Sequence, residues 1–197
     1  MRTTRRRFRA LLSAALPLLL AAIAPVLAAA RSVGARRASA PCPGADLRPR
    51  PFAAAQVETA TVCLINRIRV SHRLLPLNAN RYLQRVAGAQ VGHMVRWNYF
   101  ADVRPSGQTP SRLIASTRYA AHAAGLATGQ NIGWGTGDDT TPARIVAAWM
   151  QSPPHRAVIL CPRFHDVGAA VASVLPTFLR RGEPGALYAA EFGARGR

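Results

Sequence analysis

The chain has 197 residues, enough for one domain of ordinary size preceded by a processed leader. All 26 of its basic residues are arginine, and they outnumber the 8 acidic residues to give a formal net charge of +18. A charge of this sign favours adhesion to anionic polymers or lipids. The arginines are scattered along the sequence rather than grouped with aromatic residues, which argues against a protein that reads nucleic-acid bases.

Residues 1–30 have the three regions of a secretory signal peptide. Arginines in the first nine positions precede an apolar run, 10–30, that contains no charge and ends in the small residues Ala28–Ala30. The run is long enough to span a membrane, so a retained anchor is the alternative, although Pro17 and Pro25 make it a poor one. Residues 4–8 also fit the twin-arginine export pattern. We expect a cleaved leader, and no stable membrane span after cleavage.

The remaining 31–197 keep 21 arginines and 8 acidic residues, a net charge of +13. They begin with a proline-rich arm, 31–54, that shows little periodicity. In an oxidising compartment two of the three cysteines would pair. We predict a disulfide between Cys42 and Cys63, because Cys42 lies in coil that has little else to hold it. Cys161 then remains single, and a lone cysteine after an apolar pair is more often a small buried residue than a nucleophile.

The domain, 55–197, is predicted to start with helices. Apolar residues recur there at steps of three and four, the spacing of one helical face. In the first helix this spacing leaves Arg67 and Arg69 off the core face. The three helices expected from the pattern cover Ala55–His72, Asn80–Trp97 and Ser111–Ala120.

Short strands are predicted in the second half. The segment Ala121–Gly129 is rich in small residues and predicts an irregular connection in which His122 is exposed. Ile132 and Trp134 then alternate with glycines, which is typical of a strand that another backbone approaches closely. Two later strands are expected over His165–Val174 and Leu187–Phe192, and together with the helices they indicate an α+β domain.

Between these strands, either Thr140 or Thr141 can cap a helix that has Pro142 in its first turn. Ser152–Pro154 break this helix and place His155 at the head of a second short turn. A histidine held by rigid backbone and partly accessible suits a ligand or an acid/base group. The equally supported alternative is a histidine that only braces the turn.

The order of motifs resembles the bacterial branch of the CAP superfamily, the secreted SCP domain shared by cysteine-rich secretory proteins, antigen 5 and pathogenesis-related proteins. The resemblance extends from about Thr59 to Gly193, and its most specific part is the run Trp149–Leu160. The other residues that carry it are Cys63–Asn66, Arg69, Pro76–Leu77, Met94, Tyr99–Phe100, Gly129, Asn131–Ile132 and Glu191–Gly193.

This resemblance implies a three-layer α-β-α sandwich with a central antiparallel sheet and a surface cleft. In the family the cleft holds histidines and glutamates that bind a divalent metal, often zinc. His155 matches one family histidine, but Asp102 stands where the family has another, and Gln130 stands where it has a glutamate. Because glutamine is a weak ligand and no base, the cleft looks degenerate. We predict a ligand-binding cleft formed by His155, Asp102, Gln130, Asn131 and Ser152, with His155 and Asp102 as the ligands of any zinc or calcium ion.

The leader, the charge and the resemblance together predict a bacterial protein that is secreted or held in the cell envelope. We expect a monomeric, non-catalytic binding module for a lipid, an anionic cell-wall polymer or a protein, and no nucleic-acid partner. One alternative is a metal-assisted hydrolase or peptidase that uses His155 and Asp102. Another is an envelope protein kept near the wall by charge alone.

Overall fold

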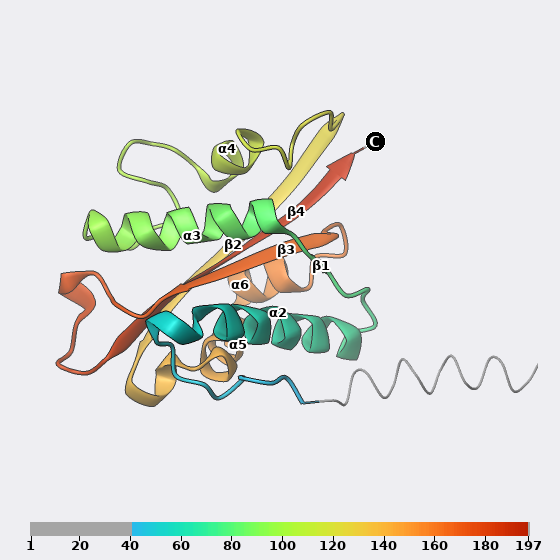
Figure 1. Cartoon of the computed structure of the whole chain (residues 1–197). Helices are drawn as coiled ribbons and strands as arrows, with labels where there is room; N and C mark the ends of the chain where they lie inside the picture. Colours follow the sequence, from blue (N-terminus) through green and yellow to red (C-terminus); the bar gives the residue numbers. More distant parts are fainter. Residues whose placement is uncertain (1–40, 197) are drawn as a thin grey trace, which may run out of the picture. The chain divides into compact units, whose positions relative to one another are not determined.

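A four-stranded sheet between two layers of helices forms the frame of the computed structural model, which describes residues 41–196 (Figure 1). The three longer strands are antiparallel, whereas the shortest strand pairs parallel to its neighbour. The predicted leader, 1–30, and residues 31–40 of the arm lie outside the described residues. In the spatial order β1-β3-β4-β2, the strands are β1 (Asn78–Ala79), β3 (Asp166–Ala172), β4 (Gly185–Gly196) and β2 (Gly125–Thr136).

The helices cover both faces of this sheet (Figure 1). One layer contains α2 (Ala54–Ser71), α5 (Pro142–Gln151) and α6 (Pro153–Ile159), and the other contains α3 (Arg81–Arg96) and α4 (Pro110–Ala115). Short 3-10 turns occur at η1 (Pro51–Ala53), η2 (Gly137–Thr140) and η3 (Thr177–Leu179). The predicted three-layer α-β-α sandwich is confirmed. None of the helices between residues 41 and 196 is both long and apolar enough to cross a membrane.

Strand β4 contributes to a core on each side of the sheet because its side chains alternate between the two faces. Tyr188 and Phe192 pack with α2, α5 and α6, whereas Leu187 and Ala189 pack with α3. With helices on both faces, a strand reads as a nearly continuous apolar run instead of an alternating one. Glu191 is the single charged residue in this buried part of β4.

Side-chain caps fix the start of α3 in one layer and of α5 in the other. The Asn80 side chain accepts from the backbone N–H groups of Tyr82 and Leu83 at the start of α3. Thr141 accepts from Arg144 at the start of α5, and Pro142 occupies the first turn, as one of the two predicted capping arrangements requires.

Two local predictions need correction: one segment is a strand because it has a distant pairing partner, and one short helix starts earlier than expected. Residues 125–129 are not irregular, because β2 pairs with β4 along its whole length from Gly125 to Thr136. The predicted break is confirmed, because α5 ends at Gln151 and a second short helix follows. That helix starts earlier than predicted: Pro153 and Pro154 form the first turn of α6, where backbone N–H groups have no partner within the helix.

Arg69 corrects a third prediction, since it is 1% exposed rather than off the core face. Its guanidinium donates to the carbonyl oxygens of Leu75, Ile159 and Cys161 at 2.8–2.9 Å. These bonds connect α2 with the end of α6 and with the segment before β3. The helical spacing did not reveal the burial, because the carbonyl groups of α6 and the following segment that satisfy this charge lie about ninety positions away along the chain.

The predicted disulfide between Cys42 and Cys63 is present, with a Cα–Cα distance of 5.8 Å. It attaches the arm to α2, and Ala143 of α5 donates its backbone N–H to the carbonyl of Ala45 at 2.9 Å. Cys161 is unpaired and partly buried, as expected.

Candidate functional site

A partly buried amide, predicted as part of the cleft, and a fully buried carboxyl lie side by side on the neighbouring strands β2 and β4. Gln130 of β2 is in register with Glu191 of β4, and the Gln130 amide Nε2 donates to Glu191 Oε1. Glu191 is fully buried. The even-numbered β2 side chains point toward α3 and α4, since Ile132 packs with α3 and Thr128 bonds to Ser111 of α4.

A second glutamine, Gln90, holds the loop after α3 close to this pair. Gln90, fully buried on α3, donates its amide Nε2 to the carbonyl oxygens of Ala101 at 3.1 Å and Asp102 at 3.3 Å. Arg104 donates from Nε to Gln90 Oε1 at 3.2 Å. The backbone at Asp102 is therefore held by α3, while the Asp102 side chain is exposed.

Burial raises the pKa of Glu191 to about 7. The Gln130 hydrogen bond and the Arg104 charge lower this pKa, and the Asp102 charge raises it, so loss of hydration is the dominant cause. Glu191 Oε2 and Gln130 Oε1 are buried and have no hydrogen-bond partner among residues 41–196. Both are acceptors when the carboxyl is ionised, whereas a protonated Glu191 can donate to Gln130 Oε1. Protonation thus supplies the donor that this pair lacks.

The remaining predicted site residues form a second group on the other side of β2. Asn131 donates from Nδ2 to the His155 carbonyl at 3.0 Å, and His155 Nδ1 lies 2.8 Å from Ser152 Oγ. His155 is partly exposed on α6. That helix packs on the face opposite Gln130, because a Cβ added at Gly129 would meet Phe164 and Val158.

The structure thus brings Gln130 near Asp102, and it brings Asn131, Ser152 and His155 together. A single cleft that includes all five residues stays a prediction. Its donor set does not fit a zinc ion, which takes four ligands, usually three or four of them histidine, cysteine or carboxylate. Between residues 41 and 196, no three such side chains come together in a way that could hold a metal ion.

The buried hydrogen-bonding roles of Glu191, Gln90 and Arg104 were not predicted from the sequence. Two signals were available: Glu191 is the only charge in an apolar run, and Gln90 interrupts the apolar stripe of α3. A polar residue at a core position needs a hydrogen-bond partner, so both positions indicate a buried network.

Comparison with known sequences agrees with the family resemblance that the motifs indicate. The sequence model of the cysteine-rich secretory protein (CAP) family matches residues 62–174. The chain is 32% identical over 118 residues to the uncharacterized protein YkwD of Bacillus subtilis. This match covers 60% of the chain and 43% of YkwD, so the chain spans less than half of that protein.

Solved structures share the fold at low identity. An outer surface protein of Borrelia burgdorferi matches with a TM-score of 0.55 and 18% identity, over 68% of this chain and 89% of that one. An extracellular SCP-domain protein of Bacillus anthracis matches with a TM-score of 0.55 and 20% identity, over 76% and 44% of the two chains. A cysteine-rich secretory protein of Staphylococcus aureus matches with a TM-score of 0.51 and 16% identity, over 73% and 40%.

Proposed function

This chain belongs to the cysteine-rich secretory protein (CAP) family, and on that premise we propose that it is a secreted, non-catalytic binding module. Its ligand is a lipid, an anionic cell-wall polymer or a protein. The hydrogen-bonded pair of Gln130 and Glu191 is the observation that supports the proposal, because the amide of one proposed cleft residue is already bonded to a fully buried carboxyl. A neutral amide at this place is neither a base nor a strong metal ligand.

Two further observations support export and adhesion. Residues 1–30 have the pattern of a signal peptide, and the rest of the chain has a net charge of +13. A Bacillus anthracis protein with a similar fold is described as extracellular. The Cys42–Cys63 disulfide joins the arm to the domain, and such bonds are typical of oxidising compartments.

Metal binding by the full chain separates this proposal from a metal-assisted hydrolase. After dialysis we expect no stoichiometric zinc or calcium by elemental analysis, and no saturable uptake of either ion by calorimetry. The restored variant Asp102→His with Gln130→Glu should gain zinc affinity, since it adds an imidazole and a carboxylate. Retained metal that is lost in His155→Ala would overturn the proposal and support the enzyme.

Adhesion itself is measured by sedimentation of the full chain with purified cell walls and with vesicles of anionic or neutral lipid. Attraction between exposed charges is screened over about 8 Å at physiological ionic strength. Binding to anionic walls or vesicles that falls as salt rises supports a polymer or lipid ligand held by charge. No binding to either surface at low salt would refute the charge-driven ligands and leave a protein ligand to be sought.

A further inference from the structure

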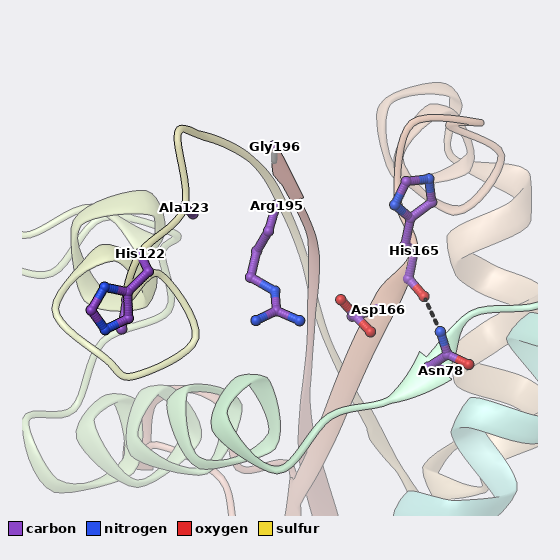
Figure 2. A pocket seen from close by; sticks show the side chains of 8 residues that line it. Asn78, His122, Ala123, His165, Asp166, Arg195 and Gly196 are labelled. Carbon is purple, nitrogen blue, oxygen red and sulfur yellow. Dashed lines mark hydrogen bonds between the residues drawn. The ribbon is translucent and has the colours of Figure 1, made fainter.

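Strand β2 is the last strand on its side of the sheet. It pairs with β4 along its whole length, from Gly125 to Thr136, and with no other strand between residues 41 and 196. Figure 2 shows its start, where the turn of His122 and Ala123 leads into β2 near Gly196 at the end of β4. The edge of β2 that faces away from β4 therefore has no strand of the described chain beside it.

The indole of Trp149 identifies which backbone groups of β2 face this edge. Its Nε1 donates to the carbonyl of Ile132 at 2.9 Å, on the side away from β4. Because backbone groups alternate along a strand, Leu126, Thr128 and Gln130 present their N–H and C=O groups on the same side. Among residues 41–196, none of these groups forms a hydrogen bond.

The other strands give the same assignment. The carbonyl of Val167 in β3 accepts from the backbone N–H of Asn80, just beyond β1. The odd-numbered residues of β3 therefore face β1, and the even-numbered residues bond to β4. The registers then leave the odd-numbered residues of β2 to bond to β4. The even-numbered residues of β2, with Thr128 among them, face outward.

Side-chain contacts hold this stretch of β2 in place. Leu126 packs on the apolar cluster that includes Leu113 of α4, and Thr128 Oγ1 lies 2.7 Å from Ser111 Oγ. All three edge residues are nevertheless partly exposed. Since a buried backbone group without a partner is costly, we expect water at these groups in the free protein. An edge that is already ordered loses little conformational freedom when a strand is added to it.

The two helices that border this edge carry positive charge and no acidic residue. α4 contacts β2 on one face of the sheet, and α6 contacts it on the other (Figure 1). Their charged side chains are Arg112 and Arg156, both exposed. Asp102, in the loop after α3, is the acidic residue brought near Gln130, and Arg104 of the same loop offsets its charge. The surroundings of the open edge are therefore cationic.

We infer that an acidic peptide segment of another protein binds by adding a strand to the open edge of β2. Its backbone bonds to Leu126, Thr128 and Gln130, and its carboxylates lie near Arg112 and Arg156. Main-chain hydrogen bonds supply the affinity of such a strand. Charge complementarity favours an acidic partner over a second copy of this chain, whose net charge over 31–197 is +13. The inference rests on the proposed binding function and names one ligand class for it.

Amide hydrogen exchange of the full chain, followed by NMR, tests the pairing. The probe is a capped octapeptide in which glutamate alternates with threonine, and the same peptide with lysine in place of glutamate is the control. We expect exchange at Leu126, Thr128 and Gln130 to slow by about tenfold or more with the acidic peptide alone. Asn131, whose N–H already faces β4, should not change.

Three outcomes of this experiment would overturn the inference. Binding of the acidic peptide without protection of the edge amides would exclude strand addition. Equal protection by the lysine peptide would exclude selection by charge, and absence of binding at low salt would exclude the site. The proposed function fails by a separate readout, the metal retained after dialysis.

A proline tests the edge donor directly. Thr128→Pro removes the N–H at the centre of the open stretch, and proline is tolerated where that group faces away from the partner strand. The acidic peptide should bind about tenfold more weakly, the effect of losing one hydrogen bond. Thr128→Val is the matched control, because it keeps the N–H and loses only the hydroxyl. Thermal unfolding shows that each variant is folded, and equal affinity in the two would contradict the inference.

Charge variants keep the test independent of the proline. The double variant Arg112→Gln, Arg156→Gln should bind the acidic peptide more weakly and with less dependence on salt. The matched control Arg50→Gln, Arg181→Gln removes the same charge from two exposed positions outside the helices that border β2. Equal losses in both double variants would show attraction by overall charge and would refute the site.

Discussion

Among single residues, Glu191 couples the stability of the fold to pH. Its pKa in the folded protein is raised to about 7 by burial, so folding favours the protonated form. The stability that this residue contributes is fully present below the carboxyl pKa of the unfolded chain, and it is lost as pH rises through about 7. Glu191→Gln should remove this dependence and increase the stability at pH 8 relative to pH 5 by about 2 kcal/mol. Urea unfolding of both proteins at the two pH values measures the effect. Glu183→Gln, in an exposed loop, should show no such difference, and a Glu191→Gln effect that is equal at both pH values would contradict the assignment.

Between elements, α3 lies so close to β3 that the strand has no room for a side chain at Gly168. A Cβ there would overlap the backbone of Gln84 and Leu83, and backbone atoms cannot move aside as a flexible side chain can. Gly168→Ala should therefore lower the free energy of unfolding by about 2 kcal/mol or more, as an overpacked core position does. Gly92→Ala is the matched control on the exposed side of α3, where no atom lies within 4 Å of the added Cβ, and it should stabilise the protein by about 0.5–1 kcal/mol. Thermal unfolding distinguishes the two, and a neutral Gly168→Ala would refute the close packing.

Across the whole domain, the Cys42–Cys63 disulfide attaches a segment with little regular structure to the helical layer that α2 and α5 form. A closed loop of about 20 residues is expected to stabilise a fold by about 3 kcal/mol, chiefly by restricting the unfolded chain. The double variant Cys42→Ser, Cys63→Ser should unfold at correspondingly lower urea concentration and keep the sheet. Cys161→Ala, which removes the unpaired thiol, is the control and should change the midpoint much less. If the double variant unfolds at the parent midpoint, the arm is held by its other contacts, such as the Ala143–Ala45 hydrogen bond.

Patterns in the amino-acid sequence were sufficient to predict the fold class, the main helices, the disulfide and the family. These features are local or follow from short motifs: apolar spacing reveals a helix, Thr141 and Pro142 reveal its start, and the run Trp149–Leu160 reveals the resemblance. The full length of β2, by contrast, depends on its pairing with β4, which begins about sixty residues later. No local pattern in 125–129 carries that information.

The surroundings of the polar residues became known only from the folded structure. The motif order includes Glu191, but it does not reveal that this carboxyl is buried beside Gln130. Helical spacing placed Arg69 off the core face, because the carbonyl groups that accept its hydrogen bonds lie outside the helix, between residues 75 and 161. Whether a side chain is buried, and which group pairs with its charge, depends on neighbours that come from all parts of the chain. A sequence can therefore show which residues need partners, while the packed fold decides which partners they have.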